Sequence, residues 1–490
     1  MVGLFLFFLI NLPNYPSQEN VNYYLYKVKR GDSWYKLFKN DWIYFARFNR
    51  LGKLKPGLII KIPYDLEDIK NYTPMPKVFN EWKYIKKGIL VNLEEQFLGG
   101  YEFGELKFSY PISSADPDCV DDFGRKEYCE TPEGDFEILA FDKNHKSSIY
   151  FDAETKEGVE MPYAILFFLK KTSRGVQAFW LHGGELPGYP ASHGCVRLML
   201  NDIKNLYFWA GGKNKDGVIW VKTGIPVKIY NSPFIYVEQG GVTIYQIPIE
   251  SSKAYFDDRE LSIFLKDNNK YVLITANVNE NPGRHLLIVK SDSKIILTKT
   301  IIVKPVKYPK NISKFWNRRS FTKEELERIE KEKEELRKAY DNPETFSYWL
   351  NGFVYPIEIK DNIGKVLHKF GEIRINPINK RSRYHLGIDI KAPEGYPVSV
   401  IGDGVVKHAG FNYLLEGNIT VVDHGNEIYS LYLHQSKIFV KVGEKVKKGQ
   451  IIGLVGKTGN ANGPHLHLMI RIKDVYIDPL KLLAQSDKIK

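Results

Sequence analysis

Short runs in which apolar and polar residues alternate recur along this chain, and they predict a protein built mainly from β-strands. Two such runs lie at 135–140 and 163–168. Two more, at 273–278 and 285–289, are bounded by clusters of Asp, Asn, Pro and Gly that favour turns. Strands at this regular spacing across 231–304 are typical of a small β-sandwich.

Helical spacing is limited to a few segments. In residues 24–64 a strand, two helical stretches and a second strand follow one another, which predicts a small α+β module. A helix is expected over 202–209. Another is expected over 323–340, where Thr322 and Glu325 have the spacing of a capping box.

Length and charge narrow the picture. A chain of 490 residues is too long for one hydrophobic core, so several domains are expected. The net charge of +12 favours polyanionic partners. Because the basic residues are dispersed and no nucleic-acid-binding module is recognisable, we expect an anionic cell envelope rather than nucleic acid. Residues 65–87 and 305–345 are expected to be linkers, the second of them basic and ending in a helix.

The first residues are apolar. The run VGLFLFFLINL is too short to span a bilayer as a standard helix, and it resembles the apolar region of a secretory signal. We therefore interpret 1–18 as an export signal, or alternatively as an uncleaved, membrane-associated segment. Either reading places the protein outside the cytoplasm, in the periplasm or cell wall.

The run LHGGELPGYPASHGCVRL, residues 181–198, carries the first candidate chemistry. A thiol beside an imidazole can ionise, and the thiolate is a nucleophile. Cys195 lies close in sequence to His193 and His182. Arg197 would favour a thiolate or bind a carboxylate. A buried structural cysteine and a metal site are the alternatives. The loop is rich in Gly and Pro, which disfavours the first, and no fourth ligand is apparent, which disfavours the second.

This run resembles the active-site signature of the L,D-transpeptidases that act on peptidoglycan, and the upstream TPEGDF at 131–136 resembles a second motif of that family. The resemblance covers 88–230 and implies a β-rich domain that needs no cofactor. It implies Cys195 as nucleophile and leaves open whether His182 or His193 is the base, with His182 favoured. The remaining positions of the signature are Ser192, Gly194 and Arg197.

The other two cysteines, Cys119 and Cys129, lie ten positions apart. In an oxidising compartment they could close a small loop. That pairing would leave Cys195 as the free thiol that a nucleophile requires, but spacing alone does not decide it.

The second candidate site lies near the C-terminus. His385 and Asp389 are four residues apart and His465 and His467 two apart, so on strands each pair shares one face. Imidazoles with a carboxylate are typical zinc ligands, and three protein ligands leave a position for water. Scattered surface histidines are the alternative interpretation of this region. A structural role is expected for the isolated His285, His408 and His424.

The region 346–485 resembles the lysostaphin/LytM-type zinc endopeptidases of peptidoglycan, through HLGID at 385–389, HLH at 465–467 and YLH at 432–434. The resemblance implies a β-rich domain with one zinc ion, held by His385, Asp389 and His467. It implies that His434 and His465 orient water and stabilise the oxyanion.

Residues 24–64 resemble a LysM module, which implies binding to peptidoglycan glycan strands. The predicted protein is thus a multidomain, mainly β peptidoglycan-remodelling enzyme with a cysteine L,D-transpeptidase and a zinc metallo-endopeptidase. Peptidoglycan is the expected partner, and no oligomeric state is predicted. The alternative is a wall-binding scaffold, with one active site or none, that activates other hydrolases.

Overall fold

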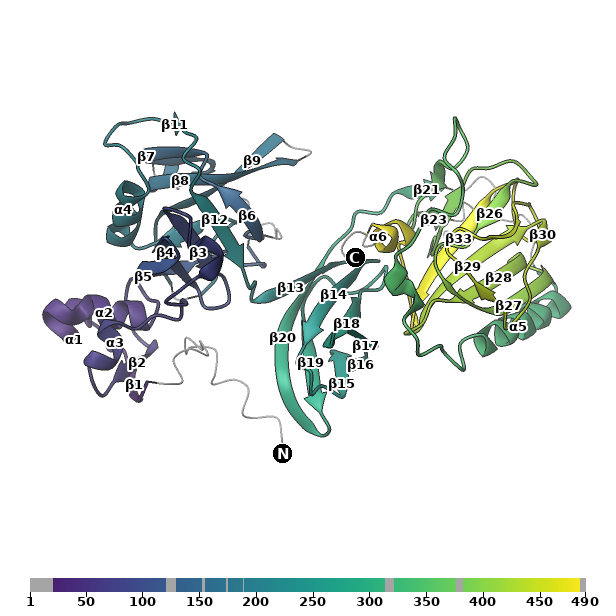
Figure 1. The fold of residues 1–490 in the computed structure, drawn as a ribbon, viewed down its shortest axis with the longest axis horizontal. Coiled ribbons are helices and arrows are strands. Elements are labelled where there is room, and N and C mark those ends of the chain that lie inside the picture. Colours follow the sequence, from purple (N-terminus) through teal and green to yellow (C-terminus); the bar gives the residue numbers. More distant parts are fainter. Residues whose placement is uncertain are drawn as a thin grey trace. The chain divides into compact units, whose positions relative to one another are not determined.

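A computed structural model describes residues 21–119, 129–151, 155–172, 175–187, 189–312, 321–375 and 382–484. The predicted export segment, 1–18, lies outside these ranges. The chain divides into two compact units, 1–233 and 234–490, and both are built mainly from strands, as the alternation predicts (Figure 1). Within the described ranges, no helix has the length and apolar character needed to cross a membrane.

The first unit begins with the expected strand–helix–helix–strand order. Strand β1 (Tyr23–Lys27) pairs antiparallel with β2 (Ile59–Pro63), and helices α1 (Trp34–Phe38) and α2 (Trp42–Phe48) lie between them in sequence. Ser33 caps α1 by accepting a hydrogen bond from the Lys36 backbone N–H, which satisfies one of the free donors at a helix start. The four elements enclose a core that includes Trp34, Phe45, Phe48, Ile60 and Ile62.

The segment 65–87, expected to be a linker, carries secondary structure of its own: α3 (Glu67–Lys70) and η3 (Asn80–Trp82). Met75 and Trp82 are buried in one cluster with Phe97 and Tyr101 of the following domain. This segment is structured rather than a linker because burial of its apolar side chains against the adjacent domain is favourable.

An arginine ties this N-terminal module to the following domain. The Arg50 side chain is fully buried; its Nε donates to the Glu95 carbonyl at 2.9 Å and its Nη2 lies 3.3 Å from the Glu95 carboxylate. Its guanidinium also lies 5.0 Å from the centre of the Phe97 ring. A second contact joins Arg47 to the buried carboxylate of Asp202 at 2.5 Å. The module and the domain therefore share a polar junction in which the Arg50 and Asp202 side chains are fully buried.

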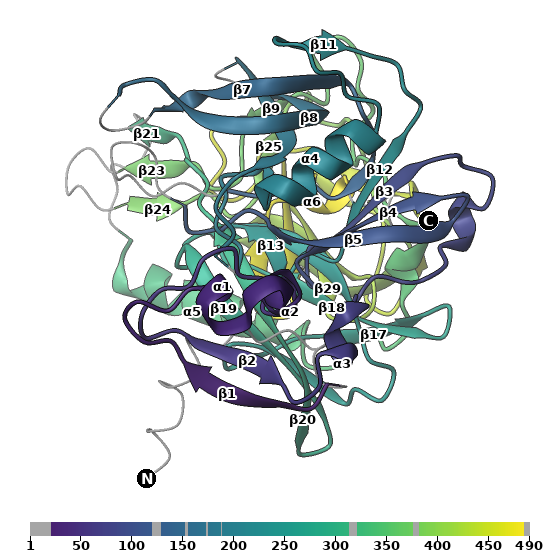
Figure 2. The same cartoon turned by 90° about the vertical axis from the view of Figure 1, so that its left-hand side faces the viewer.

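The following domain is one ten-stranded sheet, in the order β11-β7-β8-β9-β10-β5-β4-β3-β12-β6. Helix α4 (Leu200–Trp209) buries Ile203, Leu206 and Tyr207 against one face (Figure 2). The expected helix over 202–209 is thus confirmed. The strands are β3 (Gly88–Asn92), β4 (Phe97–Glu102), β5 (Glu105–Ser113), β6 (Gly134–Glu137), β7 (Ala140–Phe151), β8 (Gly158–Thr172), β9 (Gly175–Gly183), β10 (Val196–Leu198), β11 (Ile219–Trp220) and β12 (Pro226–Tyr230).

The second unit opens with two sheets that pack around a common core. One has the order β13-β20-β19-β15-β16 and the other β14-β18-β17. The strands are β13 (Phe234–Glu238), β14 (Val242–Ile247), β15 (Lys253–Phe256), β16 (Arg259–Glu260), β17 (Ile263–Lys266), β18 (Asn269–Thr275), β19 (Gly283–Ser291) and β20 (Lys294–Lys304).

The last domain is built on an eight-stranded sheet, in the order β22-β25-β33-β29-β28-β27-β31, with β34 paired to β33. Two smaller sheets, β21-β23-β24 and β26-β32-β30, complete it. The strands are β21 (Lys310–Ile312), β22 (Val366–His368), β23 (Ile373–Ile375), β24 (Ser382–Tyr384), β25 (Ile388–Ile390), β26 (Pro397–Ser399), β27 (Gly404–Tyr413), β28 (Gly417–Asp423), β29 (Ile428–Gln435), β30 (Lys437–Ile438), β31 (Lys445–Val446), β32 (Ile451–Leu454), β33 (Leu466–Ile472) and β34 (Val475–Ile477).

Three helical elements accompany these sheets: α5 (Lys323–Lys338), η4 (Tyr348–Asn351) and α6 (Pro479–Leu483). Helix α5 begins with the predicted capping box, in which the side chains of Thr322 and Glu325 each accept a hydrogen bond from the other's backbone N–H.

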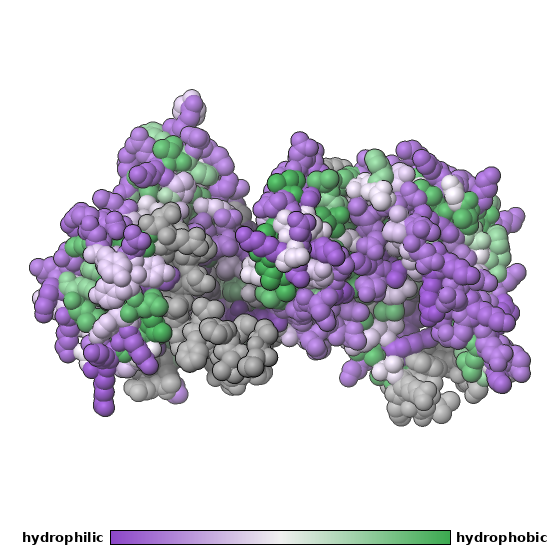
Figure 3. Space-filling model, turned by 90° about the horizontal axis from the view of Figure 1, so that it is seen from below, coloured by the Kyte–Doolittle hydropathy of each residue, from purple (hydrophilic) through white to green (hydrophobic). Residues whose placement is uncertain are grey.

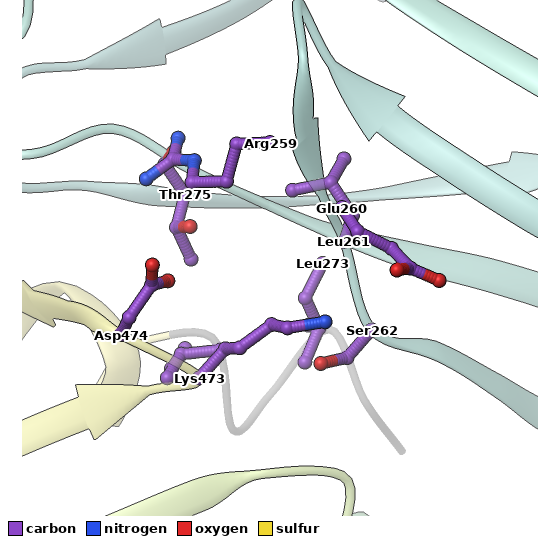
Figure 4. Close-up of a pocket in the computed structure, with 9 residues that line it drawn as sticks. Arg259, Glu260, Leu261, Ser262, Leu273, Thr275, Lys473 and Asp474 are labelled. Atoms are coloured by element: carbon purple, nitrogen blue, oxygen red, sulfur yellow. The ribbon is translucent and has the colours of Figure 1, made fainter.

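The sandwich-like domain and the last domain meet through polar and apolar contacts. Ser262 donates to the Glu427 carboxylate at 2.5 Å, and Phe264 packs against Trp349. A cavity of about 10 Å³ at this junction is lined by charged side chains from both domains, including Arg259 and Asp474 (Figure 4). None of the predicted site residues lines it. The surface seen from below is mostly hydrophilic, with apolar residues in scattered groups (Figure 3).

The Arg50 junction predicts a measurable stability effect. Arg50→Met would leave the Glu95 and Phe48 acceptors without their buried donor, which should cost about 2–4 kcal/mol. We expect the backbone amides of α2 to exchange with solvent about thirtyfold faster or more in hydrogen-exchange mass spectrometry of the full chain. Arg30→Met, at an exposed position of the same module, is the matched control and should change little. Wild-type exchange in Arg50→Met would show that the junction does not need this side chain.

Candidate functional sites

The thiol site forms where two parallel strands lie side by side. Strand β9 ends with His182 and Gly183, β10 begins directly after Cys195, and in their register His182 lies opposite Arg197. The predicted run therefore folds back on itself and brings both ends of the 184–195 loop to one edge of the sheet.

Backbone contacts hold this loop along its length. The Gly184 N–H donates to the Leu198 carbonyl at 3.0 Å, and the Ser192 N–H to the Ser114 carbonyl at 2.9 Å. The N-terminal module contributes as well, since the Gly52 N–H donates to the Leu186 carbonyl at 2.7 Å.

The residues around the cysteine have structural tasks that explain the motif. The Ser192 hydroxyl donates to the Cys195 carbonyl and accepts from the Gly194 N–H. Gly194 has a φ of +140°, and a Cβ there would lie 2.8 Å from the Phe179 ring, so the position requires glycine. Thr131, from the upstream TPEGDF, donates to the Gly194 carbonyl at 3.0 Å, which explains why the two motifs occur together.

His182 is buried and has a defined tautomer. Its Nδ1 lies 2.8 Å from the Gly183 carbonyl, which can only accept, so Nδ1 carries the proton and Nε2 is left as the basic nitrogen. Burial lowers the pKa of His182 to about 4. The imidazole is therefore neutral near pH 7, as a general base must be. His193 is half-buried in the loop.

The environment of Cys195 disfavours the thiolate that the charge of Arg197 would favour. Its side chain packs against the cluster that contains Met161, Ala164 and Trp180, and this burial raises the thiol pKa to about 11. A backbone hydrogen bond from Trp180 and the charge of Arg197 act in the opposite direction but are outweighed. Cys119 and Cys129, whose pairing the sequence left open, form a disulfide with 6.0 Å between the Cα atoms, so Cys195 is the free thiol.

The structure also shows contacts of His145, a histidine that the sequence analysis did not single out. His145 stacks on Trp180 with ring centres 4.2 Å apart, and its Nδ1 lies 2.9 Å from the Asp142 carboxylate. A spacing of three would put these residues on opposite faces of a regular strand. Tyr163 of the neighbouring strand β8 has a φ of +55°, and the contact between His145 and Asp142 was not readable from the sequence.

The second site lies between two antiparallel strands of the eight-stranded sheet. Asp389 on β25 is directly opposite His467 on β33, and His385 lies three positions before the start of β25. Atoms of all three side chains lie within 4.8 Å of one another. His467 Nδ1 is 2.6 Å and His385 Nε2 is 3.1 Å from the same Asp389 oxygen, Oδ1. All three side chains are buried.

Two further imidazoles face this cluster. The rings of His434 and His465 lie 5.1 Å apart, and His465 Nε2 is 3.6 Å from Asp389 Oδ1. Each turns its Nδ1 to a backbone carbonyl, of Thr458 and Gly463 respectively, so its Nε2 is available to the site. The five residues singled out in this region are therefore brought together.

The electrostatics of this cluster favour a cation. Burial raises the pKa of Asp389, but the hydrogen bonds with His385 and His467 outweigh it and hold that pKa far below the usual range. Burial lowers the pKa of His467, and it lowers that of His434 to about 3. A buried carboxylate beside two imidazoles is the donor set that zinc binds, so His385, Asp389 and His467 could hold it.

Other histidines have structural roles. His424 is fully buried and bonded at both nitrogens, to the Asp403 carbonyl and the Ser430 hydroxyl at 2.7 Å each. His285 pairs with Asp257 at 2.7 Å. The structural reading of both is thus confirmed.

Comparison with known proteins identifies the two domains that carry these sites. Residues 86–229 match the family model YkuD, the L,D-transpeptidase catalytic domain, and residues 383–479 match peptidase family M23.

Curated relatives match the C-terminal region. Over 127 residues the chain is 42% identical to the peptidoglycan DD-endopeptidase ShyA of Vibrio cholerae, which covers 26% of this chain and 29% of that protein. Over 121 residues it is 38% identical to the DD-carboxypeptidase/endopeptidase Mpg of Neisseria meningitidis, covering 24% of this chain and 28% of that protein. The chain thus spans less than a third of the length of either relative.

Solved structures with similarity include a peptidase M23 from Pseudomonas aeruginosa, at 25% identity and a TM-score of 0.39, covering 50% of this chain and 94% of that one. The catalytic domain of lysostaphin from Staphylococcus simulans matches at 32% identity and a TM-score of 0.23, covering 29% of this chain and 99% of that one. Two separate stretches of the chain thus resemble an L,D-transpeptidase catalytic domain and peptidase family M23 respectively.

Proposed function

We propose that this protein remodels peptidoglycan with two active sites, a cysteine L,D-transpeptidase and a zinc endopeptidase. The observation that carries the proposal is the convergence of His385, Asp389 and His467 in the region matched by peptidase family M23. The names of the relatives, a peptidoglycan DD-endopeptidase and a DD-carboxypeptidase/endopeptidase, support peptidoglycan as the substrate.

At the zinc site the chain's own residues set up hydrolysis of a peptide cross-link. His385, Asp389 and His467 would hold the ion, which when bound polarises a carbonyl and lowers the pKa of water. The Nε2 atoms of His434 and His465 face the cluster, where they would orient the attacking water and donate to the oxygen that becomes negative.

At the thiol site, His182 Nε2 removes the proton of Cys195 as Sγ attacks a carbonyl of a stem peptide. The tetrahedral intermediate collapses when the leaving amine takes that proton from His182, and a thioester remains on Cys195. An amine from a second stem peptide then attacks the thioester, and the thiol is restored. The high thiol pKa makes this proton transfer part of the attack rather than a step before it.

The module at 24–64 would hold the enzyme on glycan strands, and the whole chain would act in the cell envelope. The Cys119–Cys129 disulfide supports an oxidising compartment, where such bonds persist.

The test of both sites is digestion of purified peptidoglycan, resolved by mass spectrometry. Wild type should remove cross-links, and a chelator or His385→Ala should abolish this loss because the ion is no longer held. Cys195→Ala should abolish new linkages while cleavage continues. His285→Ala, in the sandwich-like domain, is the matched histidine control and should behave as wild type.

Two outcomes would contradict the proposal. Cleavage that survives both the chelator and His385→Ala would remove the zinc site from the reaction. A protein that binds the wall and changes no bond in any sample would instead be the scaffold that activates other hydrolases.

The raised thiol pKa predicts the pH dependence of Cys195 alkylation. With a pKa of about 11, the thiolate fraction rises about tenfold per pH unit, so the rate with iodoacetamide should still climb between pH 9 and 10. An ordinary cysteine would approach its plateau there. The rates are read by mass spectrometry at the Cys195 peptide, with Cys195→Ala as the blank. A plateau below pH 8 would mean that His182 and Arg197 stabilise the thiolate in the free enzyme.

A further inference from the structure

The two oxygens of the Asp389 carboxylate have different partners. Oδ1 faces the imidazoles of His385 and His467, whereas Oδ2 accepts a hydrogen bond from Arg374 Nη2 at 2.8 Å. Arg374 lies on β23, outside the 383–479 segment that the peptidase family model matches. A residue from the preceding part of the chain thus contacts the metal-binding carboxylate directly.

A second carboxylate holds this arginine in place. Glu372 Oε1 lies 3.8 Å from Arg374 Nε and accepts from Asn311 Nδ2 at 2.9 Å, while Oε2 lies 3.1 Å from His368 Nδ1. Glu372 is buried, so its negative charge offsets that of the guanidinium at short range. The arginine can therefore orient Asp389 without adding an uncompensated positive charge beside a cation site.

The chain before the peptidase domain anchors this network. Strand β21 pairs parallel with β23, and Asn311 lies opposite Arg374 in the register. Just before β21, the Tyr308 ring covers Gly371, where a Cβ would lie 2.0 Å from the ring. The Tyr308 hydroxyl donates to the Gln239 carbonyl of the sandwich-like domain at 2.8 Å.

We propose that Arg374 is a positioning residue that presents Asp389 to the metal through Oδ1 alone, and that β21 and β23 supply this support. A carboxylate free at both oxygens can chelate an ion with both, whereas one whose Oδ2 is held by an arginine offers one. Fixing the carboxylate in this way keeps a coordination position open for water. The inference rests on the metal site of the proposed function and not on its substrate.

The experiment uses the full chain loaded with Zn²⁺ or Co²⁺. Arg374→Ala should weaken Zn²⁺ binding about tenfold to a hundredfold in competition with a chromophoric chelator, because the carboxylate loses its orientation. In the Co²⁺ form, the visible absorption band should lose intensity as Asp389 binds through both oxygens and the coordination number rises. Asn311→Ala, one contact further out, should weaken binding less. Lys445→Ala, an exposed cation of the same domain, should leave affinity and spectrum unchanged.

The affinity and the Co²⁺ spectrum together distinguish positioning from mere stability. Should Arg374→Ala fail to fold, Arg374→Gln takes its place, since it keeps a donor and removes the charge, and an intermediate shift in both readouts is expected. Wild-type affinity and spectrum in the arginine variant would overturn the inference. Wild type that binds Zn²⁺ but cleaves no peptidoglycan would overturn the proposed substrate and leave this inference standing, whereas wild type without Zn²⁺ binding would overturn both.

Discussion

Hydrogen bonds to backbone carbonyls decide what the two sites can do. His182, His385, His434 and His465 each turn Nδ1 to a carbonyl oxygen, of Gly183, Lys369, Thr458 and Gly463 respectively. Since a carbonyl only accepts, each ring carries its proton on Nδ1 and offers Nε2 to the site. In the proposed function this arrangement would make His182 a base and His385 a metal ligand, the first at the end of β9 and the second just before β25.

Burial is the second constraint, and it acts differently at the two sites. At Cys195 it suppresses the charged form, so in the proposed reaction the neutral thiol would pass its proton to the neutral His182 imidazole during attack. At Asp389 the neighbouring imidazoles outweigh burial and the carboxylate stays ionised. Arg374 holds Oδ2 of this buried carboxylate, so Oδ1, which lies beside His385 and His467, is the oxygen left for a metal ion.

Residues that hold each site in place lie outside the segment that matches the family model. The N-terminal module contacts the thiol-site loop through Gly52 and Leu186, and its Arg50 is buried against the transpeptidase domain. In the second unit, Asn311 and Glu372 lead to Arg374 and the metal-binding carboxylate. In both cases a residue outside the segment that matches the family model contacts a residue of the site. A domain truncated to the matched segment would therefore lack these supporting contacts.

The sequence by itself determined the local features. Motif spacing predicted that His385 lies near Asp389 and His465 near His467. The capping-box pattern predicted the helix start at Thr322, and the motif around Cys195 predicted the free thiol. Each of these features depends on residues near one another in the chain. The tertiary structure alone decided the rest: the burial that keeps Cys195 protonated, the pairing of Asp142 with His145, and the contact of Arg374 with Asp389. These depend on strand register and on desolvation, which arise only when distant segments pack together.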